Sequence, residues 1–273
     1  MRRRVPFPFA LLRFWGGRIL PMWAFIGLVI FLMQLAVCAI VHDNDSVKSF
    51  LRFIDVLPAF IKTALGGELL QAGNVPGLIL IGYQHPLVLF LYLLYAVAVP
   101  ATLLTGETQK GMMELILSRP ATKTQVYVCA SLLTLLGMVS LVLVMFLGTV
   151  AGTHLYDFGE HIPLDLFFRI GVNGGLVAGA AGAITLLAAG ALGGRNRAVG
   201  VAVAVLVLQY FAWVVSQWWP HLRFLKPMTL FYYSSSRTLA VGWPLADMGV
   251  LLLIILGGAF LGGVLWQRRD LPL

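Results

Sequence analysis

The side chains that could take part in chemistry are few in this sequence, and histidine offers the first candidates. The five histidines all fall outside the long apolar runs: His42, His85, His154, His161 and His221. His154, Asp157 and His161 lie close enough in the sequence to suggest a metal site, but their spacing matches no common zinc pattern. We therefore expect solvated loop histidines and no metal site.

A nucleophile or a nucleotide site is equally hard to assign. Ser234, Ser235 and Ser236 have no plausible base on a rigid element, so this run is typical of a turn or loop. No lysine follows a glycine, which excludes a phosphate-binding loop of the form G-x-x-x-x-G-K-[ST]. We expect no catalytic residue and no ATPase activity in this chain itself.

Composition shows which elements must position any functional group. Of the 273 residues, 60% are hydrophobic and 11% are charged, far from the composition of soluble globular domains. A membrane-crossing helix needs about 20 apolar residues, and six runs are long enough: Leu20–Val41, Pro86–Thr105, Val126–Val150, Ile170–Leu192, Ala198–Gln217 and Leu245–Trp266. The first is too long for the apolar centre of a signal peptide. We expect an all-α membrane protein with six transmembrane helices in one domain, residues 1–273.

The six runs contain no charged residue well inside them. The nearest are Arg169, just before the fourth run, and Asp247, near the outer end of the sixth. Charges kept inside a membrane usually serve ion-coupled transport or catalysis, so a secondary transporter and an intramembrane enzyme are the weaker alternatives. Only uncharged polar groups are available for such roles: Gln34, Thr134, Ser140, Asn173, Thr185 and Gln209.

The distribution of Lys and Arg predicts the orientation of the chain. On the side of the two termini we count twelve basic residues against three acidic ones, and on the other side seven against eight. Cytoplasmic flanks carry the excess of positive charge, so we expect both termini in the cytoplasm and a multi-pass protein of the cell (inner) membrane. The net charge of +8 is thus a topology signal and gives little support to nucleic-acid binding.

Three segments outside the runs have membrane-surface character. Residues 1–18 are basic and aromatic, which fits either an interface helix or a simple basic tail, and Phe14-Trp15-Gly16-Gly17 is expected to break a helix there. Residues 53–65 have apolar side chains at helical spacing, which predicts an amphipathic helix in the first outer loop. The aromatic residues of Trp218–Pro244 predict a belt at the outer interface with membrane lipids.

Glycines recur at helical spacing in two of the runs. They are Gly171, Gly175 and Gly179 in the fourth run, with Gly258 and Gly262 in the sixth. Small residues spaced in this way let membrane helices approach closely. We expect them to pack helices within the chain, and a moving interface between subunits is the alternative.

The main candidate for function is the loop between the second and third runs. Glu107 to Ser118 can form a short helix, with Met112, Leu115 and Ile116 facing membrane or partner and Glu107, Lys110 and Glu114 facing water. Arg119-Pro120 should stop it, because the residue before a proline disfavours helical geometry. Thr122 should then cap the next helix.

This loop resembles that of the permeases of type-2 ATP-binding-cassette (ABC) exporters. The residues that carry the resemblance are Glu107, Gly111, Glu114, Leu115, Leu117, Ser118 and Pro120. It implies half of a transporter: two permease subunits, identical or different, form the translocation path, and separate cytoplasmic ATPase subunits dock beneath them. Any cofactor, ATP with Mg, would belong to the ATPase and none to this chain.

The resemblance also implies roles for residues of the loop. Glu107–Pro120 would be the coupling helix, with Glu107 and Glu114 pairing with basic residues of the ATPase and Arg119 with an acidic one. Lys110 and Leu115 belong to the same surface. Two alternatives remain: a loop whose charges are merely solvated, and a permease-like subunit that anchors or assembles an envelope machine. The apolar spans favour a lipid-like cargo over an ion.

Overall fold

A computed structural model describes residues 7–43, 75–234 and 241–270, with the single residues 52, 56 and 239. Every regular element in this part of the chain is a helix. The elements are α1 (Phe9–His42), α5 (Val75–Ile79), α6 (Ile81–Gln84), α7 (Pro86–Pro100), the π-helix η1 (Ala101–Gly106), α8 (Glu107–Gln109), α9 (Met112–Leu117), α10 (Lys123–Leu155), α11 (Leu164–Ala191), α12 (Arg195–Trp218), the 3₁₀ helices η2 (Pro220–Met228) and η3 (Leu230–Tyr233), and α14 (Leu245–Arg268). The amphipathic helix expected at 53–65 lies outside the described residues.

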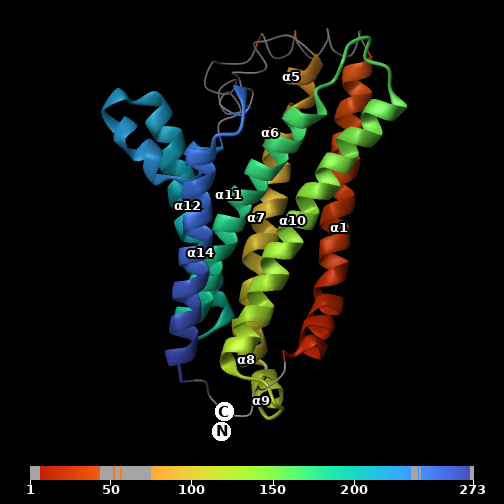
Figure 1. The fold of residues 1–273 in the computed structure, drawn as a ribbon. Helices are drawn as coiled ribbons and strands as arrows, with labels where there is room; N and C mark the ends of the chain where they lie inside the picture. Colours follow the sequence, from red (N-terminus) through yellow and green to blue (C-terminus); the bar gives the residue numbers. More distant parts are fainter. Residues whose placement is uncertain are drawn as a thin grey trace.

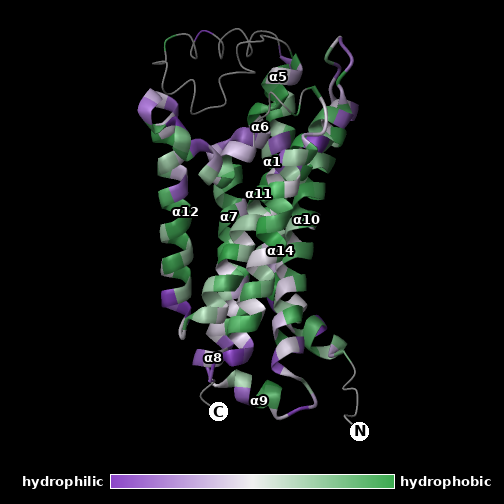
Figure 2. Cartoon of the chain, turned by 60° about the vertical axis from the view of Figure 1, so that its left-hand side comes forward, coloured by the Kyte–Doolittle hydropathy of each residue, from purple (hydrophilic) through white to green (hydrophobic). Residues whose placement is uncertain are grey.

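Six helices are long and apolar enough to cross a membrane, and they form an elongated bundle (Figure 1). They are α1, the run from α5 to α8, α10, α11, α12 and α14. Figure 2 shows hydrophobic residues along the middle of these helices and hydrophilic ones towards both ends. The prediction of a multi-pass, all-α membrane protein is therefore confirmed. We call the two ends of the bundle the α9 end and the α5 end.

The first helix is longer than expected. It begins at Phe9 and runs without interruption through Gly16 and Gly17, so the prediction that these glycines break a helix was wrong. A glycine costs a helix about 1 kcal/mol relative to alanine. The large Trp15 side chain is fully enclosed and packs in the bundle core, which fixes the first turns of α1.

The second span is built from several pieces. His85 separates α6 from α7, and its Nδ1 accepts a hydrogen bond from the backbone N–H of Leu87 at 3.2 Å, which caps α7. After Pro100 the chain continues as the π-helix η1 and then as α8. Single-turn π-helices are frequent at functional sites, and this one leads directly into the loop that the sequence singles out.

Helix α11 lies at the centre of the bundle and packs on its neighbours through small residues. A methyl group built on Gly258 of α14 would lie 3.2 Å from the carbonyl oxygen of Ala183, and one on Gly262 would lie 2.9 Å from that of Leu186. Gly179 lies against Ile255 in the same way, while Gly175 and Gly171 lie against Val142 of α10. These positions are close approaches within the chain.

The α9 ends of α10, α11 and α14 are fastened together by polar contacts. Arg269 Nη1 donates to the carbonyl oxygen of Leu192 at 2.6 Å, just past the end of α11. Lys123 Nζ donates to the carbonyl of Arg269 at 3.0 Å, and Trp266 Nε1 donates to the carbonyl of Lys123 at 3.0 Å. Three spans therefore form one fixed unit at this end.

Helix α12 is held much less firmly. Gly194 joins α12 to α11 with φ 113°, a backbone conformation that residues other than glycine rarely adopt. Figure 2 shows α12 standing apart from the other long helices, and its buried face in the α9 half consists of Ala198, Ala202 and Leu206. Nearer the α5 end it packs on η3, since the rings of Tyr210 and Phe231 lie 5.3 Å apart.

Candidate functional site

The candidate site is the α8–α9 segment, which lies beyond the long helices at the α9 end (Figure 1). The single helix expected from Glu107 to Ser118 is two short helices. They are separated by Gly111, which has φ 70°, the left-handed conformation that glycine adopts without strain. The prediction of one continuous helix was therefore wrong, and the chain changes direction at Gly111.

The first part, α8, is buried at Glu107 and Thr108. Glu107 has no exposed surface, and its Oε1 accepts a hydrogen bond and ion pair from Arg18 Nη1 of α1 at 2.9 Å. The hydroxyls of Thr105 and Thr108 donate hydrogen bonds to backbone carbonyls four residues earlier, at 2.6 and 2.7 Å. The expectation that Glu107 faces water was wrong, because an arginine 89 residues away compensates its charge.

Glu107 keeps one buried oxygen without a partner. Among the described residues no hydrogen-bond donor reaches its Oε2. A second arginine lies nearby, since a methyl group built on Gly106 would be 3.5 Å from Cδ of Arg195, the first residue of α12. The carboxylate thus lies on the second span and is bound to α1, and the start of α12 lies against the neighbouring Gly106.

The second part, α9, has one face packed on the bundle and one exposed face. Met113 is buried in the core of the bundle, and Ile116 and Leu117 are partly buried against it. On the other side Glu114 is exposed, and Leu115 has 61% of its surface free. Leu115 therefore faces outward as expected, with a carboxylate next to it.

The exposed surface continues to the start of α10. Lys110, Gly111, Arg119 and Pro120 are all exposed. The helix stops before Arg119-Pro120, and Thr122 Oγ1 then accepts from Gln125 N while the Gln125 side chain accepts from Thr122 N. This capping box confirms the cap predicted at Thr122.

Sequence reasoning missed Arg18. Nothing around it in the chain marks it as a partner of Glu107, since it is one of several basic residues before the first apolar run. The available signal was positional: Arg18 and Glu107 lie at the same end of consecutive spans, where basic residues far outnumber acidic ones.

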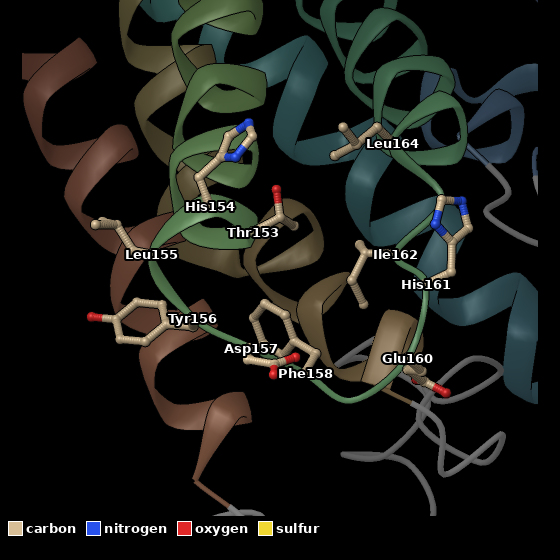
Figure 3. Close-up of a pocket in the computed structure, with 10 residues that line it drawn as sticks. All are labelled: Thr153, His154, Leu155, Tyr156, Asp157, Phe158, Glu160, His161, Ile162 and Leu164. Atoms are coloured by element: carbon tan, nitrogen blue, oxygen red, sulfur yellow. The ribbon is translucent and has the colours of Figure 1, made fainter.

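The residues considered for metal binding do not assemble. His154, at the end of α10, and His161, in the following loop, line an open pocket of about 530 Å³ at the α5 end, and Figure 3 shows their rings on different sides of it. His42 Nδ1 lies 2.6 Å from the backbone oxygen of Asp157. In the described ranges no three His, Cys, Asp or Glu side chains are grouped so that they could hold a metal ion.

The uncharged polar groups of the spans bind parts of the chain itself. Asn173 Nδ2 donates to the carbonyl of Tyr233 at 3.0 Å, and Gln209 Oε1 accepts from the N–H of Leu230 at 3.0 Å. Ser140 accepts from Trp23 Nε1 at 2.8 Å. Thr134 and Thr185 bond to carbonyls one turn back, and Gln34 lies 3.5 Å from the carbonyl of Ile79.

Comparison of the chain with protein-family models gave no match, and comparison with curated proteins gave none either.

Proposed function

We propose that this chain is the permease subunit of an ATP-driven ABC exporter and that α9 is its docking helix for a separate cytoplasmic ATPase. The observation that carries the proposal is that α9, a short helix with an exposed face, directly follows α8, which is anchored in the bundle. Helix α9 presents Glu114 and Leu115 away from the bundle, while α8 is fixed to the spans through Glu107 and Arg18.

This arrangement suits the transmission of force. A partner that displaces α9 pulls on α8 through Lys110 and Gly111, and α8 continues through η1 into α7. The ion pair passes the same displacement to α1. Closure of nucleotide sites on the ATPase would then move two spans together, as in hinge or shear transitions.

The charge pattern supports a cytoplasmic position for the α9 end. Basic residues outnumber acidic ones on this side of the sequence, and the excess marks the cytoplasmic side in membrane proteins. A second permease subunit, identical or different, would complete the translocation path, and membrane lipids would cover the remaining apolar faces. The protein would then reside in the cell (inner) membrane.

The test is recovery of the ATPase with the tagged chain. We expect purification from the native host in mild detergent to recover a P-loop ATPase, and Glu114→Arg to lose it, because the reversed charge faces the docking surface. Asp157→Arg is the matched control, since Asp157 is an exposed acid at the α5 end. It should retain the ATPase.

Two results would contradict the proposal. Stable purification of the unaltered chain with no ATPase would favour a secondary transporter or an anchoring subunit of an envelope machine. Equal recovery with Glu114→Arg and Asp157→Arg would mean that the ATPase docks elsewhere. Retention of folding in each variant is checked by the elution position of the detergent-solubilised protein.

A further inference from the structure

The 3₁₀ segment η2 exposes an unusual number of large apolar side chains. None of its residues is buried, and Phe224 and Met228 have 64% and 71% of their surface exposed. Trp218 and Trp219, just before it, are more than half exposed. Figure 1 shows this blue segment projecting from the end of α12, away from the other helices.

The same segment is basic and contains no acidic residue. His221 and Arg223 are exposed and Lys226 is partly buried, while no Asp or Glu occurs between Asp165 and Asp247. Lys226 Nζ donates to Gln217 Oε1 at 3.0 Å, which is a neutral acceptor. The segment therefore supplies no counter-charge of its own.

The exposed side chains are displayed from a fixed backbone. Tyr233 donates its hydroxyl to the carbonyl of Pro227 at 2.7 Å, and Thr229 donates to that of Lys226 at 2.9 Å. Leu230 and Phe231 follow directly and are buried between α12 and the bundle. Phe224 and Met228 therefore belong to a folded segment whose apolar side faces outward.

A membrane interface satisfies both properties of this surface. The segment begins where α12 ends at Trp218, at the level where aromatic residues meet lipid headgroups. Apolar side chains enter the acyl boundary there, and Lys or Arg meets phosphate. A protein partner would instead have to supply acidic groups beside an apolar face.

We propose that η2 binds the phosphodiester groups of anionic lipids, with Arg223 and Lys226 as phosphate ligands and Phe224 and Met228 inserted beneath them. This contact secures the end of α12 that is farthest from Gly194. The proposal does not depend on the transport function proposed above, because it concerns only the lipid contact of one segment.

The first measurement is the depth of η2 in the membrane. Cys38→Ala and Cys129→Ala first remove the native cysteines from the full chain, and Phe224→Cys then provides the site for a spin label. The labelled chain is reconstituted in phosphatidylcholine–phosphatidylglycerol vesicles. We expect oxygen to reach the label more readily than a water-soluble nickel chelate does. His161→Cys, an exposed loop position, should show the opposite preference, and chelate access at 224 equal to that at 161 would overturn the proposal.

The second measurement is the response of that label to anionic lipid. Raising the phosphatidylglycerol fraction should slow the label, and Arg223→Gln should raise the fraction needed by about fivefold, the effect of one basic residue near an anionic surface. Arg223→Lys should restore the response. Arg197→Gln, which removes the same charge from the other end of α12, should leave it unchanged.

Other outcomes would assign the surface differently. Label mobility in pure phosphatidylcholine equal to that at high phosphatidylglycerol fractions would mean that η2 does not select anionic lipids. Spin–spin broadening that disappears on dilution with unlabelled chain would identify the occupant as a second copy. Loss of response in both Arg223→Gln and Arg197→Gln would mean a general effect of charge, and each of these results would overturn it.

Discussion

The carboxylate of Glu107 connects elements that are far apart in the sequence. It lies on α8 and binds Arg18 of α1, while Arg195 of α12 lies against the preceding Gly106. Glu107 is fully buried while the Arg18 side chain is partly exposed, so removing the arginine leaves an uncompensated charge in a site of low polarity. Loss of the arginine should therefore destabilise the chain by more than the ion pair itself stabilises it.

The substitution Arg18→Ala tests this at the scale of one residue. We expect it to lower the free energy of unfolding in mild detergent by about 3 kcal/mol, because Glu107 stays buried without its partner. Adding Glu107→Gln should recover a large part of that loss in a double-mutant cycle. Arg13→Ala, an exposed arginine on the same helix, is the control, and an equal effect of both arginine substitutions would contradict the structural role.

At the scale of elements, close approach of helices depends on the absence of side chains. Helix α14 is mostly exposed along its outer face but lies very near α11, where Gly262 faces the backbone of Leu186 and Leu187. Backbone atoms of a central helix cannot move aside as a flexible side chain can. The contact therefore tolerates no added carbon atom at this position.

Gly262→Ala should consequently destabilise the chain, by about 1 to 3 kcal/mol as for other overpacked sites. Gly257→Ala is the matched control on the same helix, since a methyl group there meets no atom within 4 Å. It should be neutral or slightly stabilising, because alanine favours the helix. Thermal unfolding of both variants in one detergent distinguishes these results, and equal melting temperatures would show that α14 adjusts its position.

At the scale of the whole molecule, the spans differ in how firmly they are held. The contacts of Lys123, Trp266 and Arg269 fasten α10, α11 and α14 at the α9 end. Helix α12 begins after Gly194 and has a narrow buried face. In any large rearrangement we therefore expect α12 to move relative to α10, α11 and α14, and these three helices to move together.

Distances between spin labels test this division in the proposed complex with the ATPase. The pair Leu132→Cys and Leu261→Cys joins α10 to α14, and the pair Val203→Cys and Leu261→Cys joins α12 to α14, all at exposed positions. We expect ATP to change the second distance by several ångströms and to leave the first unchanged. A larger change between α10 and α14 would refute the fixed unit.

The long spans were predictable from the sequence, whereas the interior of the candidate site was not. Runs such as Val126–Val150 are apolar for long enough that only a spanning helix accommodates them. The burial of Glu107 depends on Arg18, 89 residues away, and local pattern does not contain such a partner. The continuity of α1 through Gly16 and Gly17 likewise depends on where Trp15 packs, which tertiary structure decides.

The single glycine joint at the start of α12 has a geometric consequence. A helix of 24 residues is about 36 Å long at 1.5 Å per residue, so a rotation of about 10° at Gly194 would carry its far end through about 6 Å. Helix α12 is in this sense a lever with its fulcrum beside the candidate site. A small turn at the fulcrum, close to Arg195 and Glu107, would sweep the aromatic residues at the far end across the width of a lipid headgroup.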